Sequence, residues 1–312
     1  MRVFGVALLA LIASCYSPAF QDCEVTCASG VCPTGFTCEL GVCRSEGATG
    51  ACGQMMVDAK TIDSDPSADN DMDGLINSMD NCEDKANADQ ANEDTDALGD
   101  VCDPCPIARG PQADLDGDGD GVGDACDPTP GSMNRLVVFE GFNAPPASNP
   151  SLLPTQASWS YANGKATVVN PGANVIAAMT WPQMPSARGD MVVSAFTINS
   201  FSPQTPFGAG VVQFMSASAG TGVVCWVARE SFGDGLEMFQ RGVSGSQVTF
   251  SYPIQPGLPT AAAMIRDSTM FQCSDSQAHT VTNTYSLTGS QFGIFDIGVG
   301  ATFEYVMIVT RL

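Results

Sequence analysis

The sequence has few basic residues, a single histidine and no apolar run long enough to span a bilayer. Of its 312 residues, 12 are Lys or Arg and 34 are Asp or Glu, which gives a formal net charge of −22. This balance excludes nucleic acid as an expected partner, because phosphate binding requires a basic surface. With only one His, catalysis by His and His-rich metal sites are also disfavoured.

The abundant features are acid and cysteine, and both are unevenly placed. Between Asp58 and Asp127 there are 21 acidic and 3 basic residues, whereas residues 132–312 carry 9 and 7. Eleven of the 13 cysteines lie at or before Cys126. We therefore divide the chain into five segments, which cover residues 1–14, 15–53, 54–68, 69–131 and 132–312.

The N-terminus reads as a targeting segment. Arg2 precedes a short apolar run over residues 3–13, which predicts a secretory signal peptide over residues 1–14. The run ends in Ile12-Ala13-Ser14-Cys15 and resembles a bacterial lipobox. The resemblance implies that Cys15 is diacylated and anchors a secreted protein to the cell envelope, at the outer membrane and facing outward. The alternative is an ordinary signal peptide with Cys15 in a disulfide. The odd cysteine count favours the lipid, since removing Cys15 leaves twelve.

Residues 15–53 contain a small cysteine-rich module. Its six cysteines lie between Cys23 and Cys52, among Gly, Pro, Thr and Ser residues. A segment this short cannot bury enough apolar surface to fold alone, so we expect three disulfides, with fifteen connectivities open. A zinc site is the weaker alternative, because the module has no CxxC pair and no His. The module resembles the segments that follow the lipid-bearing Cys in myxobacterial-type lipoproteins, which implies a structural spacer.

The acidic middle contains three 12-residue stretches that start 23 and 24 residues apart. Each has oxygen-bearing side chains at positions 1, 3, 5, 9 and 12, and the first and third have Gly at position 6. This is the ligand layout of an EF-hand loop, in which Ca²⁺ is bound by six to eight hard oxygens. The predicted ligands are Asp69, Asp71, Asp73, Asn77 and Asp80; Asn92, Asp94, Asp96, Asp100 and Asp103; and Asp116, Asp118, Asp120, Asp124 and Asp127.

The flanks of these stretches differ from those of an EF-hand, since Cys, Pro and Asn replace the amphipathic helices. The segments Asp80-Asn81-Cys82, Gly99-Asp100-Val101-Cys102-Asp103 and residues 119–127 resemble thrombospondin type 3 repeats. The resemblance covers about residues 69–128. It implies loops wrapped around Ca²⁺ ions, with disulfides Cys82–Cys102 and Cys105–Cys126, and we expect the ions to stiffen a stalk.

Two departures concern the second loop, where Ala97 replaces Gly and Asn92 replaces Asp. A non-Gly residue in a left-handed conformation costs about 1 kcal/mol or more, so we expect this loop to bind most weakly. The alternative for the whole stretch is a disordered acidic linker. The phased acids and cysteines favour ordered loops.

Residues 132–312 consist of short alternating or apolar segments separated by Gly, Pro, Ser and Asn. They predict a mainly-β protein with a C-terminal β-sandwich or jelly roll, preceded by the disulfide-rich module and the calcium-stapled repeats. The stretch 302–309, Phe142, Trp159 and the segment 223–226 resemble laminin G-like and concanavalin-like jelly rolls, which implies the fold and not the ligand. Cys225 and Cys273 remain after the other pairings, and we expect them to bridge two strands. The expected strands are 135–139, 165–169, 175–181, 191–199, 210–215, 223–230, 236–241, 247–252, 264–267, 270–274, 280–283, 292–297 and 302–311.

Nothing in this segment matches a catalytic motif, and we predict that the protein is not an enzyme. Carbohydrate-cleaving jelly rolls carry a Glu-x-Asp-x-x-Glu strand, because hydrolysis requires two spaced carboxylates. Here Glu230 and Glu237 flank a Gly-containing turn, which predicts a hairpin, and His279 is expected to be a surface or structural residue.

The remaining candidates are aromatic residues that can stack on sugar rings, although most are expected in the core. We therefore expect a surface-anchored calcium-binding lipoprotein that binds a glycan or a surface protein, as in adhesion, through its C-terminal domain. The alternatives are an atypical polysaccharide-cleaving enzyme and a purely structural component of the envelope. The aromatic candidates are Trp159, Tyr161, Trp181, Phe201, Phe207 and Trp226.

Overall fold

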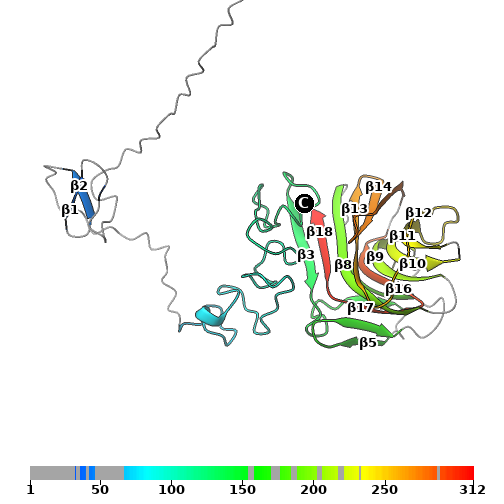
Figure 1. The fold of residues 1–312 in the computed structure, drawn as a ribbon, viewed down its shortest axis with the longest axis horizontal. Coiled ribbons are helices and arrows are strands. Elements are labelled where there is room, and N and C mark those ends of the chain that lie inside the picture. Colours follow the sequence, from blue (N-terminus) through cyan, green and yellow to red (C-terminus); the bar gives the residue numbers. More distant parts are fainter. Residues whose placement is uncertain are drawn as a thin grey trace, which may run out of the picture. The chain divides into compact units, whose positions relative to one another are not determined.

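The computed structural model of the chain divides into two compact units, Met1–Asp65 and Pro66–Leu312 (Figure 1). The predicted signal peptide and the lipid site at Cys15 lie outside the residues that the structure describes. Within the described part of the chain, no helix has the length and apolar character needed to cross a membrane. The described residues are 32, 36–39, 42–45, 67–153, 158–169, 176–183, 188–201, 206–216, 221–231, 233–286 and 289–312.

In the first unit, the described residues form one antiparallel hairpin of β1 (Phe36–Glu39) and β2 (Val42–Ser45). Cys43 on β2 is buried and forms a disulfide with Cys32. One pair among the six cysteines of the module is thus assigned. The other pairings of the module lie outside the described residues.

The second unit begins with the acidic segment, in which the one described helical element is the short 3-10 helix η1 (Asn77–Met79). Strands follow from residue 134 to residue 311. They are β3 (Asn134–Glu140), β4 (Ser151–Leu153), β5 (Ser158–Tyr161), β6 (Ala166–Val169), β7 (Ile176–Pro182), β8 (Arg188–Phe201), β9 (Phe207–Met215), β10 (Val223–Glu230), β11 (Gly233–Gln240), β12 (Val248–Ser251), β13 (Pro259–Asp267), β14 (Met270–Asp275), β15 (Thr280–Thr284), β16 (Gln291–Ile297), β17 (Val299–Phe303) and β18 (Val306–Arg311).

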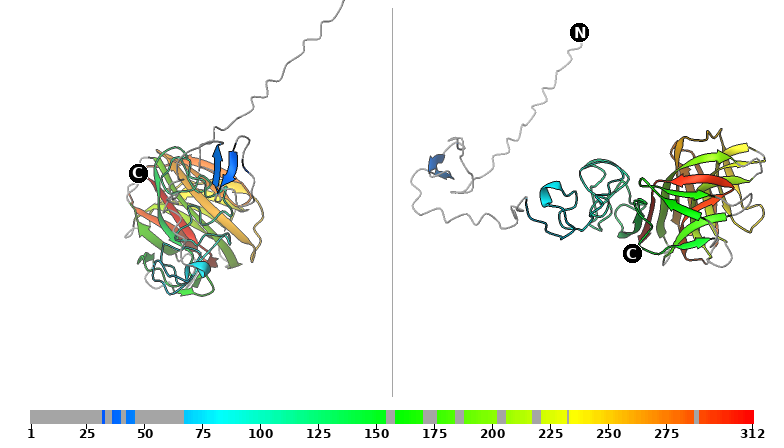
Figure 2. Two further views of the ribbon diagram at one scale, coloured as in Figure 1. Left: turned by 90° about the vertical axis from the view of Figure 1, so that its left-hand side faces the viewer. Right: turned by 90° about the horizontal axis from the view of Figure 1, so that it is seen from below.

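These strands form two sheets in which all the described pairs are antiparallel (Figures 1 and 2). The seven-stranded sheet has the order β12-β11-β10-β9-β16-β7-β4. The nine-stranded sheet has the order β15-β14-β13-β8-β17-β6-β5, with β18 pairing to β8 and β3 pairing to β18. The predicted all-β sandwich is confirmed.

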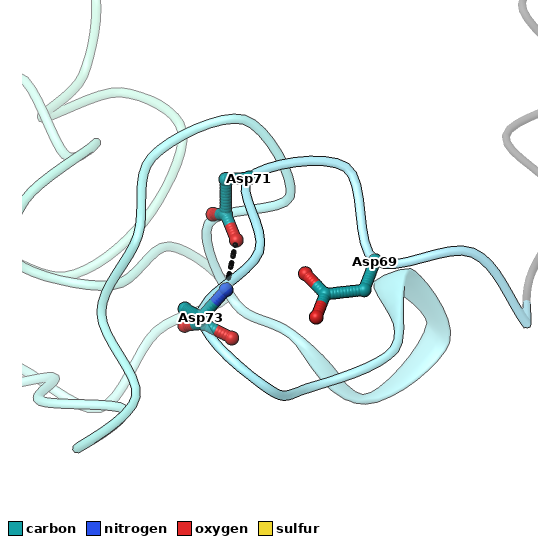
Figure 3. Close-up of side chains that lie close together, drawn as sticks. All are labelled: Asp69, Asp71 and Asp73. Atoms are coloured by element: carbon teal, nitrogen blue, oxygen red, sulfur yellow. Dashed lines mark hydrogen bonds between the residues drawn. The ribbon is translucent and has the colours of Figure 1, made fainter.

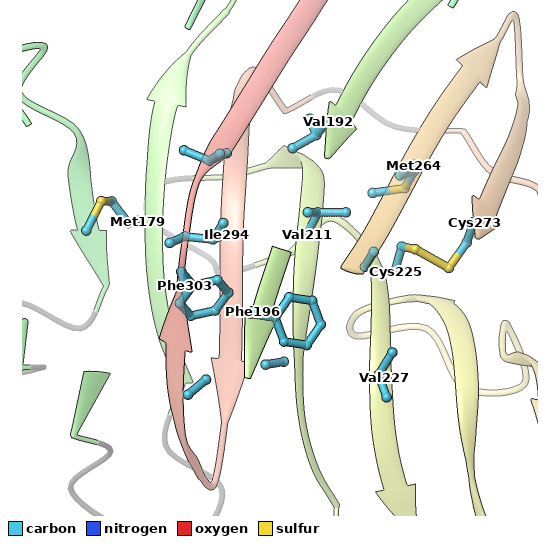
Figure 4. Close-up of a cluster of buried hydrophobic side chains, with 14 of the residues drawn as sticks. Met179, Val192, Phe196, Val211, Cys225, Val227, Met264, Cys273, Ile294 and Phe303 are labelled. Atoms are coloured by element: carbon cyan, nitrogen blue, oxygen red, sulfur yellow. A yellow bond between two sulfur atoms is a disulfide. The ribbon is translucent and has the colours of Figure 1, made fainter. Parts of the chain in front are cut away.

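The main core lies between the two sheets (Figure 4). Strand alternation sends Cys225 and Val227 of β10 into this core, while Trp226 between them faces the opposite side of its sheet. A disulfide joins Cys225 to Cys273 of β14, and both residues are fully buried. The predicted bridge therefore links the two sheets across the core.

The expected strand 302–311 is broken into two. β17 ends at Phe303 and β18 starts at Val306, and both pair with the long strand β8 at different places along its length. At the break, the amide of Glu304 donates to the Ala195 carbonyl at 2.9 Å, and the Ser194 hydroxyl donates to the Tyr305 carbonyl at 2.5 Å. The core-facing positions change across the break, from Ala301 and Phe303 to Val306 and Ile308. No Gly, Pro or Asn marks the break, so the stretch was expected to be one strand.

Most of the aromatic residues considered for sugar stacking belong to the sandwich interior. Trp181, Phe207 and Trp226 are at most 2% exposed, and Trp159 and Tyr161 pack partly buried against the core. The side chain of Phe201 lies outside the described residues. The buried candidates therefore offer little aromatic surface to a ligand.

Candidate metal centres and surface pockets

The three acidic loops share one hydrogen-bonding scheme, which starts from the Asp at position 5. Its Oδ1 accepts from the backbone amide two residues later, at 2.8 Å in every loop. Its Oδ2 accepts from the amide 14 residues later in the chain. The three Asp residues and their second donors are Asp73 with Asn87, Asp96 with Gly110, and Asp120 with Asn134.

Positions 9 and 12 follow the same scheme. The side-chain oxygen at position 9 accepts from the amide at position 2, with distances of 3.1, 2.8 and 3.0 Å for Asn77, Asp100 and Asp124. The Asp at position 12 accepts from the amide two residues later, at 2.8, 2.7 and 2.7 Å. The internal repeat in the sequence is therefore also a repeat of conformation.

This scheme brings carboxylates together at each loop, and Figure 3 shows those of the first loop. One oxygen from each member of a cluster lies within 4.8 Å of the others in three groups: Asp69, Asp71 and Asp73; Asp94, Asp96 and Asp103; and Asp116, Asp118 and Asp120. Several carboxylate oxygens in and beside these groups are buried without a hydrogen-bond partner. They are Asp69 Oδ1, Asp71 Oδ2, Asp94 Oδ2, both oxygens of Asp118, and Asp127 Oδ2.

A buried carboxylate oxygen without a partner is costly, and its presence in every loop calls for a cation. The atoms that these clusters offer to a metal are carboxylate oxygens, with no thiolate or imidazole among them. Such a ligand set suits a hard cation such as Ca²⁺ rather than zinc. The residues present therefore fit the ion that the sequence predicts, although its binding remains a prediction.

The second loop avoids the strain that was expected at Ala97. Gly74 and Gly121, at position 6 of the other loops, have φ values of +99° and +89°, whereas Ala97 has no positive φ. The hydrogen bond made by the side chain at position 1 also differs in the second loop. In the other loops Asp69 and Asp116 accept from the position 6 amide, but Asn92 instead donates through Nδ2 to the Asp96 carbonyl at 3.1 Å. The second loop was expected to bind weakly because of a left-handed Ala97, and that reason is wrong.

Strain lies instead at position 4 of the loops. Met72 has a φ of +65° and Thr95 a φ of +62°, while the third loop has Gly119 with a φ of +79°. A left-handed backbone is unfavourable for any side chain and most of all for a β-branched one. Only the third loop therefore has glycine at both left-handed positions.

Acidic groups around the second loop hold protons more tightly than usual. Burial raises the pKa of Asp103 to about 7. A hydrogen bond from the Cys105 amide opposes this shift, and repulsion from Asp114 adds to it. Burial also raises the pKa of Asp100 to about 6, and that of Glu93 to about 7 with further repulsion from Asp100. Protons would therefore compete with a cation at this loop.

Sequence reasoning missed one acidic residue here, Asp114. Its Oδ1 is buried without a partner, and burial raises its pKa. At the equivalent place beside the first loop, Gln90 donates to Asp80 at 2.9 Å. Aligning the residue two places before each loop start would have shown this Gln-to-Asp change.

Disulfides Cys82–Cys102 and Cys105–Cys126 join successive loops, in the pairing that the resemblance implies. Beside the second of them the chain is tightly packed. A Cβ on Gly123 would lie 2.3 Å from the Ala113 carbonyl oxygen, so only glycine fits there. The loops thus depend on covalent links and close backbone contacts rather than on a large core.

The third loop packs directly on the sandwich (Figure 2). Four residues of the repeats form a common apolar cluster with residues of β8 and β18, and Asn134 of β3 supplies donors to the loop. This end of the expected stalk is thus attached to the face of the nine-stranded sheet that is turned away from the main core. The cluster contains Cys105, Ala113, Val122 and Cys126 of the repeats with Met191, Val193, Met307 and Val309 of the sandwich.

One surface pocket, which we name the sheet pocket, lies on the side of the seven-stranded sheet that faces away from the main core. It has a volume of about 370 Å³ and is lined by Trp226, Glu230, Phe239, Arg241 and Gln247, among others. Beside it, the buried Glu237 accepts hydrogen bonds from the Trp226 indole at 3.1 Å and the Gln247 amide at 2.7 Å.

The two acids of this region, Glu230 and Glu237, lie on the two strands of one hairpin. β10 and β11 form the predicted hairpin, in which Glu237 is opposite Trp226 and Glu230 is opposite Gly233. Their backbone positions are four residues apart along the hairpin, about 13 Å at 3.3 Å per residue. Burial raises the pKa of Glu237 to about 7, and repulsion from Glu230 adds to the shift.

A second pocket, which we name the edge cleft, lies beside the segment that connects β12 to β13. It has a volume of about 360 Å³ and is lined in part by Tyr252, Gln255, Leu258, Gln277 and His279. His279, expected as a surface or structural residue, is partly buried and packs between aromatic rings.

No protein-family model matches the sequence, and no curated protein matches it significantly. Similar solved structures include the carbohydrate binding module CBM66 from Bacillus subtilis, with 12% identity over 48% of this chain and 89% of that chain and a TM-score of 0.36. The VIP36 exoplasmic/lumenal domain in its metal-free form has 7% identity over 57% and 92%, with a TM-score of 0.42. The GH43 protein BlXynB from Bacillus licheniformis has 14% identity over 55% of this chain but only 39% of that chain, with a TM-score of 0.42. These likenesses are too distant to carry an argument about function.

Proposed function

We propose that this protein binds Ca²⁺ through its three acidic loops and presents the β-sandwich as a binding domain at the cell surface. The observation that carries the calcium proposal is the repeated scheme of hydrogen bonds, which leaves buried carboxylate oxygens without partners in every loop. The residues that would hold the ions are those at positions 1, 3, 5, 9 and 12, from Asp69 to Asp127. A bound ion supplies the positive charge that these clusters otherwise lack.

The role of the ions in this proposal is structural. The repeats contain one short helical element and no strand among their described residues, so hydrogen bonds to carboxylates largely define their path. Cation binding would remove the repulsion between those carboxylates and fix the loops. Because the third loop shares an apolar cluster with β8 and β18, its order would extend to one side of the sandwich.

For the sandwich we propose recognition of a glycan or a surface protein, with the chain anchored through a lipid on Cys15. Two surface pockets of small-ligand size support a binding role for this domain. The rival functions are polysaccharide cleavage and a purely structural role in the envelope. Release of reducing sugar from a polysaccharide panel would support the first rival, and absence of binding to any glycan or envelope protein would support the second.

The calcium proposal is tested by titrating Ca²⁺ into the chelator-treated full chain while following circular dichroism and hydrodynamic radius. We expect a saturable change in both, and we expect EDTA to reverse it. Mg²⁺ at the same concentration is the control, because its small octahedral shell suits these loops poorly. An unchanged spectrum and radius would rule the proposal out.

A further inference from the structure

The edge cleft has the dimensions of a small-ligand site. Its volume of about 360 Å³ is within the range of about 300–1,000 Å³ typical of such sites. It lies where the segment after β12 meets the turn between β14 and β15, so residues 252–260 and 277–279 contribute most of its lining. This places it on a different part of the sandwich surface from the sheet pocket, with which it shares no lining residue.

One wall of the cleft is aromatic and held in place. The His279 ring centroid lies 4.4 Å from those of both Phe250 and Tyr252. The Asp275 side chain is fully buried and fixes the imidazole through His279 Nδ1 at 2.8 Å, while also accepting from the His279 amide at 3.0 Å. The wall thus presents aromatic surface at little conformational cost.

The segment that connects β12 to β13 is also anchored. The Tyr252 amide donates to the Asp234 carbonyl at 3.0 Å, and the Gly257 amide donates to the Ile198 carbonyl at 2.9 Å. Asp234 is itself held by Arg229 through two bonds of 2.6 and 2.8 Å. The cleft is therefore largely formed before a ligand arrives.

The chemistry of the lining indicates the ligand class. None of the described residues that line the cleft is Asp, Glu, Lys or Arg, although the chain has a net charge of −22. Neutral hydrogen-bonding groups come from Gln255, Thr260 and Gln277, and Leu258 adds an apolar surface that is 56% exposed. Such a site suits an uncharged molecule with apolar ring faces and a hydroxyl-bearing edge.

We propose that the edge cleft binds a neutral pyranose unit of a glycan, with a ring face against Tyr252 beside the edge of His279 and hydroxyl groups on the glutamine amides. The proposal rests on the glycan-binding function proposed for the sandwich and names its site and ligand class. A pyranose combines the two required surfaces, since its C–H faces are apolar and its edge donates and accepts hydrogen bonds. Acidic glycans are expected to bind poorly, because the cleft offers no cationic side chain.

His279 provides a direct readout, because it is the only histidine of the chain. Untagged full chain with isotope-labelled histidine gives one set of ring signals, which needs no assignment. The chain is first screened against neutral oligosaccharides of gluco, galacto, manno and xylo configuration, with polygalacturonate as the acidic control. Addition of a bound neutral oligosaccharide should shift the His279 signals along a saturable curve.

Variants then locate the site. Gln255→Ala and Gln277→Ala, both at exposed positions, should each weaken binding about five- to tenfold, which corresponds to one lost hydrogen bond. Gln247→Ala in the sheet pocket is the matched control and should leave the affinity unchanged. If an oligosaccharide binds but leaves the His279 signals in place, or if only Gln247→Ala weakens binding, the site is wrong while glycan binding stands. If only polygalacturonate binds, the ligand class proposed for this site is wrong while glycan binding stands. If no glycan of the panel binds the wild-type chain, both this site and the glycan function are excluded.

Discussion

Asn134, the first residue of the sandwich, donates its backbone amide to the carboxylate of Asp120 in the third acidic loop. Its side-chain Nδ2 donates to the Asp127 carboxylate of the same loop at 2.5 Å, and the residue is fully buried. In the first loop, the equivalent amide donor is Asn87, which belongs to the repeats and not to a strand. The third loop is therefore completed by the domain that follows it.

This relationship predicts that Asn134→Ala destabilises the sandwich as well as the loop. The variant keeps the backbone amide but removes the side-chain donor to Asp127, which should cost about 1–3 kcal/mol of unfolding free energy. The measurement is thermal unfolding followed by tryptophan fluorescence, because all three Trp residues lie in the sandwich. Asn87→Ala is the matched control and should shift the transition less, and equal shifts for the two variants would contradict the link.

The same link predicts that Ca²⁺ stabilises the sandwich, where it has no predicted ligand. Chelation should lower the midpoint of the tryptophan-detected transition by several degrees, since a ligand that binds only the folded state adds stability. Asp118→Asn, in the third loop, should reduce this dependence more than Asp71→Asn in the first loop. If the midpoint of the tryptophan-detected transition does not change with Ca²⁺, the loop and the sandwich unfold independently.

The backbone conformations predict opposite results for two glycine exchanges. Gly121→Ala forces a side chain onto a φ of +89°, which should cost about 1–2 kcal/mol although the space around it is open. Ala97→Gly should bring no comparable gain, because Ala97 does not have a positive φ. Chemical denaturation in excess Ca²⁺ measures both, and a stabilisation by Ala97→Gly as large as the loss from Gly121→Ala would show that the second loop is strained at position 6.

The repeats also show how far the sequence could predict the site. The phase of the acids was sufficient to place Asp69, Asp94 and Asp118 in clusters, because alternate residues of a tight loop point inward. It could not show the hydrogen bond that the Asn134 amide donates to Asp120, 14 residues earlier in the chain, since this bond depends on where the sandwich starts. Nor could it show that Ala97 alters the backbone and frees Asn92 for another partner.

In the sandwich, period-two alternation predicted the fold class and most strands, but not features that depend on how the strands pair and pack. The break between Phe303 and Val306 is one example, because β17 and β18 pair with one neighbouring strand on either side of it. Another is the aromatic wall of the edge cleft. Phe250 and His279 are 29 positions apart, and only the packing of β12 near β15 brings their rings to 4.4 Å.

The buried Glu237 predicts a pH dependence of stability. Its pKa is raised from 4.5 to about 7, chiefly by burial, so the folded state binds more protons than the unfolded state between these values. The unfolding free energy therefore falls as the pH rises from 4.5 to 7, with a contribution of about 3 kcal/mol at most. Glu237→Gln should remove this contribution, which the difference between denaturation curves of the two proteins measures at each pH. A difference that does not change with pH would show that Glu237 titrates normally.

The central claim is that the three loops bind Ca²⁺, and counting ions tests it most directly. The full chain and the triple variant Asp71→Asn, Asp94→Asn and Asp118→Asn are dialysed against the same micromolar Ca²⁺, and the metal is determined by atomic emission. We expect at least three Ca²⁺ ions per wild-type chain and a clear loss in the variant, since each substitution removes a carboxylate from one cluster. A wild-type chain with less than one ion, or a variant with the same number as the wild type, would contradict the account.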